Sequence, residues 1–447
     1  DAAFFTLNDF RDIRCETIWS YVSRHEGTAT TLNYPLMSPP PTISGTVVPG
    51  LISWRHLRRN VFPADLYDRL QQLPGFDAQE ISWEFENEKK ALQHMSDEEI
   101  ESWVRHHLSR ERRWFEIMQY VMETEPADLT SIVFDGVDKL QHSCWRFLFP
   151  EKPLEEFSET ESRIRELSLQ YFRELDGYLE QLVAQAGPET RVFLASDHGF
   201  GPTTHVFRVN KWLEQQGYLH WINLRDGEGM RPGHYIPIDW SKTVAFAQSA
   251  ATNGVHIRVA AEAGQSGVRP EEYAAFRDEL AAKLLDVRDP ATGDKLVKDV
   301  LKREEVFAGP AMSDAPDLTL VMRDHGFISV LNLDPVVWQR PAVSGTHYPQ
   351  GILIGSGPGI RGGVELPDQE IVDVAPTLLY SLGLPIPESY EGEVIQACFE
   401  GDLLGRQPIE LAASVPEEGA MQVVGAELDA GEEETILNHL RALGYVE

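Results

Sequence analysis

Two short segments of this chain pair a carboxylate with an imidazole at a spacing that suits metal binding. Asp138 and His142 are four residues apart, so on a helix that starts here both side chains share one face. Asp197 and His198 are adjacent and follow an apolar run, and Gly199 lets the backbone turn closely past a bound ion. Carboxylate oxygens and imidazole nitrogens are ligands of divalent cations. A helix cap with a surface histidine is the structural alternative for the first pair.

A third segment, Ser344–Pro349, holds His347 in a glycine-containing turn just before the apolar run Gly351–Ile354. This position suits a metal ligand, although a single histidine is more often structural. Asp324–Phe327 repeats the four letters of Asp197–Phe200 but continues directly into alternating apolar residues. That alternation favours a hairpin turn, so we do not nominate the second copy as a metal site.

Apolar or β-branched runs flanked by turn residues recur along the chain, as buried parallel strands would. They lie at Thr28–Leu32, Ser131–Phe134, Arg191–Ala195, Leu318–Met322 and Gly351–Ile354. Helical segments separate them, which predicts an α/β fold with a doubly wound, mostly parallel sheet flanked by helices. In such sheets, ligands bind at the carboxyl ends of the strands, where the carboxylate–imidazole pairs lie.

The helices carry clear start and stop signals. Ser96 and Glu99 form a capping box that opens a helix to about Met122. A second helix is predicted to end at Gly187-Pro188, and Asp373–Leu382 is a shorter one. The second helix has one apolar stripe, formed by Ile164, Leu167, Tyr171, Leu175, Tyr178 and Leu182.

Changes in composition suggest the domain organisation. Residues 1–221 form the first part of the α/β core, and residues 312–412 form its second part. Residues 222–311, rich in Gly, Glu and Ala with weak strand signals, are predicted to be an inserted, smaller α+β subdomain. Residues 413–447 read as an acidic linker followed by an amphipathic helix.

Charge and composition limit the partners. With 39 basic and 71 acidic residues the formal charge is −32, which disfavours binding to a nucleic-acid polymer. Bound metal ions could still attract a phosphate. The three cysteines share no short spacing, which excludes a disulfide framework and predicts a cytoplasmic protein. No apolar window reaches the roughly 18–20 residues of a membrane-spanning helix.

The order of these motifs resembles a known family. Asp-x-x-x-His at 138–142, Ser-Asp-His-Gly-Phe at 196–200 and Gly-Thr-His at 345–347 resemble the alkaline phosphatase superfamily. The chain is most similar to its type I phosphodiesterase/nucleotide pyrophosphatase-like branch, with bacterial phosphohydrolase and phosphomutase relatives. Ser356–Ile360, Asp373–Leu379 and Leu440–Tyr445 also match that branch.

The resemblance implies two divalent metal ions, zinc in most relatives, with manganese as the alternative. Asp138, His142 and His347 match the ligands of one ion, and Asp197 and His198 match two ligands of the other. In the family these ions hold a small phosphate ester while a Thr or Ser hydroxylate attacks phosphorus and forms a phospho-enzyme. The implied activity is hydrolysis of a phosphodiester or phosphomonoester.

The nucleophile and a first-strand aspartate of the family are expected upstream of Asp1, in a part not contained in this chain. Gln141 stands where phosphodiesterases of the family usually have Gly, so nucleotide pyrophosphatase specificity does not follow. Two alternatives remain open: a phosphomutase with the same metal site, and a non-catalytic relative that binds metal or phosphate without a nucleophile.

Overall fold

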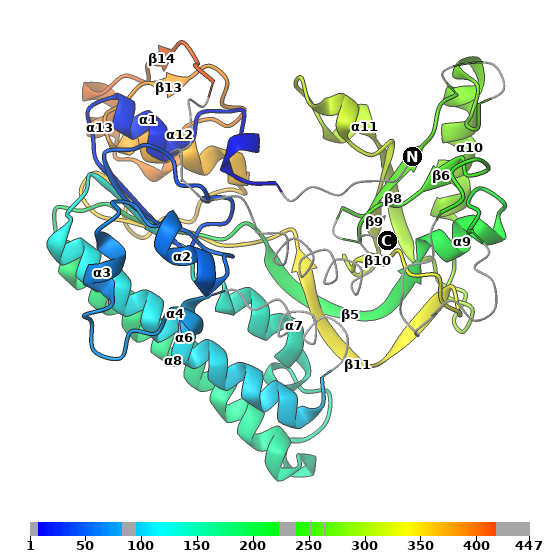
Figure 1. Ribbon diagram of the computed structural model, residues 1–447, viewed down its shortest axis with the longest axis horizontal. Coiled ribbons are helices and arrows are strands. Elements are labelled where there is room, and N and C mark those ends of the chain that lie inside the picture. Colours follow the sequence, from blue (N-terminus) through cyan, green and yellow to red (C-terminus); the bar gives the residue numbers. More distant parts are fainter. Residues whose placement is uncertain are drawn as a thin grey trace. The chain divides into compact units, whose positions relative to one another are not determined.

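A computed structural model describes residues 8–82, 95–222, 238–250, 252–260, 262 and 265–416 (Figure 1). The chain divides into two compact units. Unit 1 contains Phe200–Pro349, and unit 2 contains Thr6–Gly199 and Gln350–Glu427; the two termini grouped with unit 1 lie outside the described residues. The predicted α/β class is confirmed. The domain boundaries predicted from composition remain a prediction.

Unit 2 holds strands at four of the places where the sequence predicts buried parallel strands, but two of these four pair antiparallel with each other. β1 (Ala29–Leu32) pairs in parallel with β2 (Gly45–Val48) on one side and β3 (Leu129–Ile132) on the other. β4 (Val192–Ala195) pairs antiparallel with β12 (Leu353–Ser356), which starts two residues later than the predicted run. A short parallel pair, β13 (Ile386–Pro387) with β14 (Leu411–Ala412), completes the described strands of this unit.

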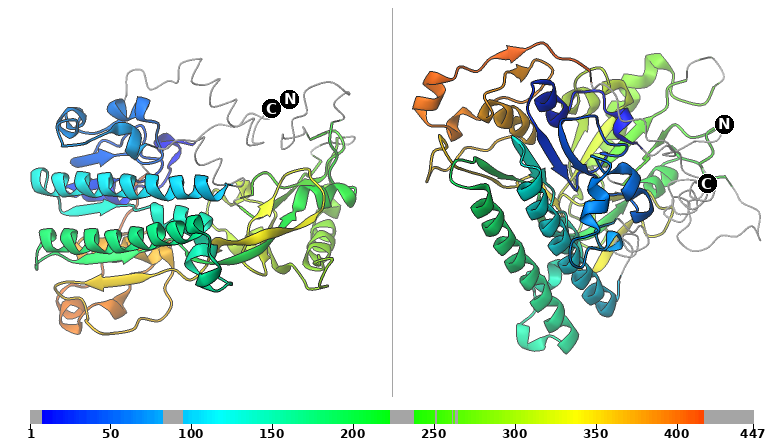
Figure 2. Two further views of the ribbon diagram at one scale, coloured as in Figure 1. Left: turned by 90° about the horizontal axis from the view of Figure 1, so that it is seen from below. Right: turned by 60° about the vertical axis from the view of Figure 1, so that its left-hand side comes forward.

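Three helices of unit 2 position the candidate site: α6 (Asp97–Thr124), α7 (Gly136–Leu148) and α8 (Glu159–Ala186). The predicted Ser96 capping box is present, and α8 ends at Gly187 with a positive φ of 82°. α6 and α8 run side by side (Figure 2) and bury their apolar stripes against each other. The remaining helices are α1 (Ile18–Arg24), α2 (Trp54–Asn60), α3 (Leu66–Leu70), α4 (Ala78–Ile81), α12 (Val374–Ser381) and α13 (Gly401–Arg406).

The described part of unit 1 contains two sheets. The long strands β5 (Gly199–Arg208) and β11 (Val337–Tyr348) lie in one, with β10 (Ile328–Ser329) at the edge. The other has the order β6-β7-β9-β8 with antiparallel neighbours. Its strands are β6 (Ala245–Phe246), β7 (Gly254–Ile257), β8 (Val297–Lys302) and β9 (Leu318–Met322), and its helices are α9 (Val209–Gln215), α10 (Tyr273–Leu285) and α11 (Arg303–Val306).

Two local predictions are wrong. Ser344–Pro349 is not a turn, because Ser344 to Tyr348 belong to β11. The segment after Asp324 does turn, but it does not form a hairpin with β9: β10 pairs in parallel with β5. The predicted C-terminal helix and acidic linker lie outside the described residues. Of the helices that the structure describes, none has the length and apolar character needed to cross a bilayer.

Candidate metal centre

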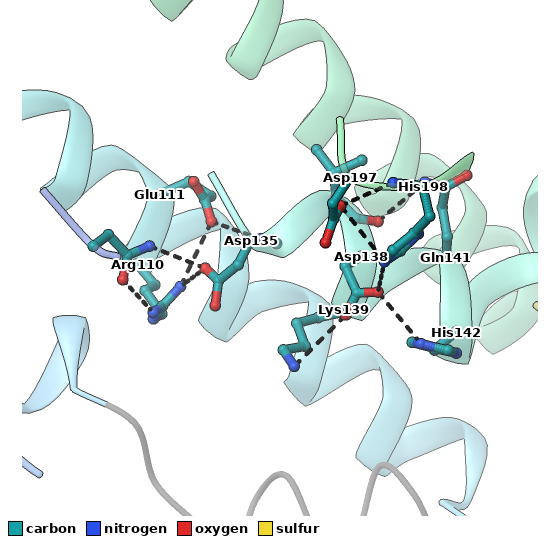
Figure 3. Close-up of polar contacts among 12 residues, drawn as sticks. Arg110, Glu111, Asp135, Asp138, Lys139, Gln141, His142, Asp197 and His198 are labelled. Atoms are coloured by element: carbon teal, nitrogen blue, oxygen red, sulfur yellow. Dashed lines mark hydrogen bonds and ion pairs between the residues drawn. The ribbon is translucent and has the colours of Figure 1, made fainter. Parts of the chain in front are cut away.

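Helix α7 presents Asp138 and His142 on one face, as their spacing predicts (Figure 3). The helix starts directly after β3, so Asp138 lies on its first turn, close to the end of a sheet strand. Asp138 Oδ1 lies 3.4 Å from His142 Nε2. Both side chains are about one-quarter exposed, which leaves their polar atoms accessible to a small ligand.

The segment after β4 brings Asp197 and His198 to the same place. His198 Nε2 lies 3.6 Å from Asp197 Oδ1 and 3.8 Å from Asp138 Oδ1 (Figure 3). The two pairs, more than fifty residues apart in the sequence, therefore meet within unit 2. The Asp197 side chain is 79% exposed, so this carboxylate faces solvent.

The donor atoms suit a divalent cation. Zinc ligands at about 2.0–2.1 Å in tetrahedral geometry are separated by roughly 3.3 Å, close to the distance between Asp138 Oδ1 and His142 Nε2. His198 Nδ1 lies 3.0 Å from the Gly199 carbonyl oxygen, to which an N–H at this position donates. A hydrogen bond from Nδ1 to this carbonyl orients the ring so that Nε2 is the nitrogen near the two carboxylates.

Lys139 belongs to the surroundings of this centre, although the sequence did not single it out. Its Nζ lies 3.6 Å from Asp138 Oδ2, while the other oxygen of that carboxylate lies near the two imidazoles. A lysine next to a predicted ligand on the first helical turn was the available signal. Its positive charge partly balances the carboxylates.

Gly199 permits a close approach within unit 2 in addition to the predicted turn past an ion, which stays a prediction. A Cβ at this position would lie 1.9 Å from the carbonyl oxygen of Gln350, so the glycine permits a close backbone approach between two chain segments. The expected close approach was to a bound ion. The neighbouring Ser196 reinforces the same junction, because its Oγ accepts a hydrogen bond from the Ile352 N–H at 2.8 Å.

His347 lies in unit 1, near the end of β11. Its ring packs edge-on against Phe200 and Phe327, with centroid distances of 5.4 and 4.9 Å. The aromatic contacts orient the imidazole from within its own unit. The side chain is half-buried.

The second Asp-His-Gly-Phe segment is built as a structural turn. Asp324 Oδ2 accepts hydrogen bonds from Thr203 Oγ1 at 2.7 Å and from the Thr204 N–H at 3.2 Å. Its Oδ1 accepts from the Gly326 N–H at 3.1 Å. These three hydrogen bonds tie Asp324 to neighbouring backbone and side-chain groups within unit 1.

A family model described as type I phosphodiesterase / nucleotide pyrophosphatase matches residues 3–349. The chain belongs to this family. The match includes all five residues nominated as ligands and the whole of unit 1 between Phe200 and Pro349. No curated protein and no solved structure matches the chain.

Membership in the type I phosphodiesterase / nucleotide pyrophosphatase family supports the predicted reaction class. Its members are generally hydrolases of phosphate esters, and the family is metalloenzyme-like. Carboxylates and imidazoles converging at the end of a strand and the start of a helix are consistent with that chemistry.

The sequence analysis did not identify two buried ionisable residues that lie beside the candidate metal centre. Arg110 and Glu111 on α6 are 3% and 1% exposed and face Asp135, the residue before α7 (Figure 3). The signal was present, because Glu111 falls on the helical stripe otherwise formed by residues such as Val104, Trp114 and Met118. A charged residue on an apolar stripe indicates a buried polar contact.

Proposed function

We propose that this protein is a metal-dependent hydrolase of small phosphate esters. Two divalent ions, zinc first and manganese as the alternative, would be held by Asp138, His142 and His347 and by Asp197 and His198. The observation that carries the proposal is the convergence of Asp138 and His198 from separate segments, with His198 Nε2 3.8 Å from Asp138 Oδ1. Family membership supplies the reaction class.

Chain connectivity supports the inclusion of His347. It precedes Gln350 by three residues, and Gln350 lies against Gly199 within unit 2. Three extended residues span at most about 11 Å, so the His347 backbone is tethered within that distance of Gln350. Its ring is already oriented by Phe200 and Phe327.

Each of the residues around the phosphate would have a separate role. When bound, the metal ions would neutralise phosphate charge and lower the pKa of the attacking hydroxyl. His198 would keep its Nε2 lone pair directed into the centre through the Gly199 carbonyl. Lys139 would balance the charge of Asp138, and the exposed Asp197 would lie on the side open to the ester. The nucleophile is proposed to be a Thr or Ser hydroxyl.

Metal analysis with activity measurements tests this function. Full-length protein purified without chelator should contain about two zinc or manganese ions per chain. It should hydrolyse a chromogenic phosphate mono- or diester, and chelation should abolish turnover until metal is restored. The variant His142→Ala should bind less metal, whereas the matched variant His106→Ala should not. Protein that contains no transition metal and cannot be loaded with it would refute the proposal.

A further inference from the structure

A buried polar cluster lies at the start of α7, to one side of the candidate ligands Asp138 and His142 (Figure 3). Arg110 and Glu111 come from α6, Asp135 ends the loop after β3, and Asn33 follows β1. Arg110 Nη1 donates to Asp135 Oδ1, and its Nη2 donates to Asn33 Oδ1 at 3.2 Å. Asn33 Nδ2 in turn donates to Asp135 Oδ1 at 3.2 Å. The cluster therefore ties α6 and the segment after β1 to the start of α7.

The first turn of α7 is capped by another helix. Asp135 occupies the N-cap position, but its side chain makes no capping hydrogen bond because Arg110 and Asn33 engage the carboxylate. The N–H of Gly136 instead donates to Glu111 Oε1 at 2.9 Å. Glu111 thus satisfies one of the amide groups that every helix start leaves without an intrahelical partner.

Gly136 makes this arrangement possible. A Cβ at position 136 would lie 2.6 Å from Tyr171 Oη and 2.7 Å from Glu111 Oε1. A larger residue would force Tyr171 Oη, Glu111 Oε1 or the start of α7 to move. The close packing and the hydrogen bond together define where the helix begins.

The surroundings favour the uncharged form of Glu111. Burial is the main cause that raises its pKa to about 8, and the neighbouring Asp135 carboxylate acts in the same direction. Arg110 and the hydrogen bond from Gly136 oppose this rise without cancelling it. A neutral carboxyl still accepts the hydrogen bond through its carbonyl oxygen, and its burial costs far less than that of a carboxylate.

We propose that Glu111 is a positioning residue that fixes the start of α7 and thereby holds Asp138 and His142 in register with His198. Gly136 is two residues before Asp138, so a shift of the helix start moves the Asp138 carboxylate with it. The positioning role concerns the fold of unit 2. Its effect on metal affinity rests on the proposed function.

Two pairs of variants test the role of Glu111. Glu111→Met replaces the carboxyl group that accepts from Gly136 by an apolar side chain of similar length. Glu111→Gln keeps an acceptor oxygen without a charge. Glu116 on the same helix, ion-paired with Arg113, provides Glu116→Met and Glu116→Gln as controls. Independently, Gly136→Ala fills the contact space, whereas Gly177→Ala adds a methyl on α8 where nothing lies within 4 Å.

The readouts are amide hydrogen exchange of residues 136–142, with α8 as internal reference, and affinity for Zn²⁺ by competition with a chromogenic chelator. Glu111→Met and Gly136→Ala should each raise exchange in the first turn of α7 and lower Zn²⁺ affinity about tenfold or more. Glu111→Gln should stay within about twofold of the wild type in both readouts, because the positioning bond survives. Glu116 and Gly177 variants should match the wild type.

Unchanged exchange at α7 in folded Glu111→Met or Gly136→Ala would overturn the proposal. So would a Glu111→Gln variant as impaired as Glu111→Met, because the acceptor oxygen would then not be the deciding feature. If Glu111→Met does not fold, the comparison of Gly136→Ala with Gly177→Ala decides. Wild-type protein that binds no Zn²⁺ would refute the proposed function, while the exchange data would still decide the role of Glu111.

Discussion

The sequence Asp-His-Gly-Phe occurs twice, once at the end of β4 and once after β9, and the two copies have different surroundings. In the first copy the Asp197 carboxylate is 79% exposed, and the His198 ring points toward Asp138. In the second copy the Asp324 carboxylate accepts hydrogen bonds from Thr203, Thr204 and Gly326. His325 adopts a left-handed φ of 56° and packs against Tyr348 at 4.5 Å.

The difference shows that this four-residue sequence does not by itself determine the surroundings of its Asp and His side chains. What decides is whether nearby donors in the fold already occupy the carboxylate oxygens, and whether a second carboxylate faces the imidazole. The first copy has Asp138 opposite it and few internal donors. The second copy has three internal donors and serves as a turn, so its carboxylate contributes to stability.

The largest expected effect separates the two histidines in catalysis. His198→Ala should lower turnover of a chromogenic phosphate ester by about three orders of magnitude, because it removes a nominated metal ligand. His325→Ala should change turnover by less than about fivefold, since the ring of His325 packs against Tyr348 and is not a nominated ligand. Steady-state kinetics of full-length protein measures both. Equal losses would show that the second copy also takes part in the reaction.

A smaller effect separates the two aspartates in stability. Asp324→Asn removes acceptor capacity from a carboxylate with three donors, so the free energy of unfolding should fall by about 1–3 kcal/mol. Asp197→Asn changes an exposed side chain and should stay within about 0.5 kcal/mol. Urea denaturation monitored in metal-free protein gives both values. The comparison between the copies fails if Asp197→Asn is the more destabilising variant.

The smallest effect concerns the pH dependence of the second copy. Burial, aided by Lys298, lowers the pKa of His325 below its ordinary value. Below about pH 6.5 the unfolded chain therefore binds a proton that the folded chain resists, so stability falls as pH falls. His325→Asn keeps a residue type that tolerates positive φ and removes the titration. Between pH 7.5 and 5.5 the wild type should lose more stability than the variant, as measured by urea denaturation at each pH; parallel losses would contradict this.

The parts of the fold that depend on local signals were predictable. Ser96 opens α6 and Gly187 closes α8 because capping is decided by residues within one turn. His347 was predicted in a turn because its neighbours include Gly345, but pairing of β11 within its sheet extends the strand through this segment. Pairing between distant strands is not written in local composition.

In the candidate site, too, the features set by nearby residues were predictable, and those set by distant segments were not. The spacing of Asp138 and His142 predicted their shared face, since both belong to one helix. Their proximity to His198 depends on the placement of α7 against β4, and the sequence motif suggested it only through the family resemblance. Glu111 escaped notice because its partner, the Gly136 N–H, is a backbone group that no motif records.

The contact between Gly199 and the Gln350 carbonyl has a further consequence for protein engineering. The chain leaves unit 2 and re-enters it at neighbouring points, so the segment 200–349 has the anatomy of an inserted module. The entropy of closing a loop rises only slowly with loop length, so unit 2 tolerates an insert of this size at that junction. Exchanging the segment between relatives at positions 199 and 350 would graft a new module onto the scaffold that carries α7 and His198. Any such graft must keep glycine at 199, because a side chain there would collide with the carbonyl oxygen of Gln350.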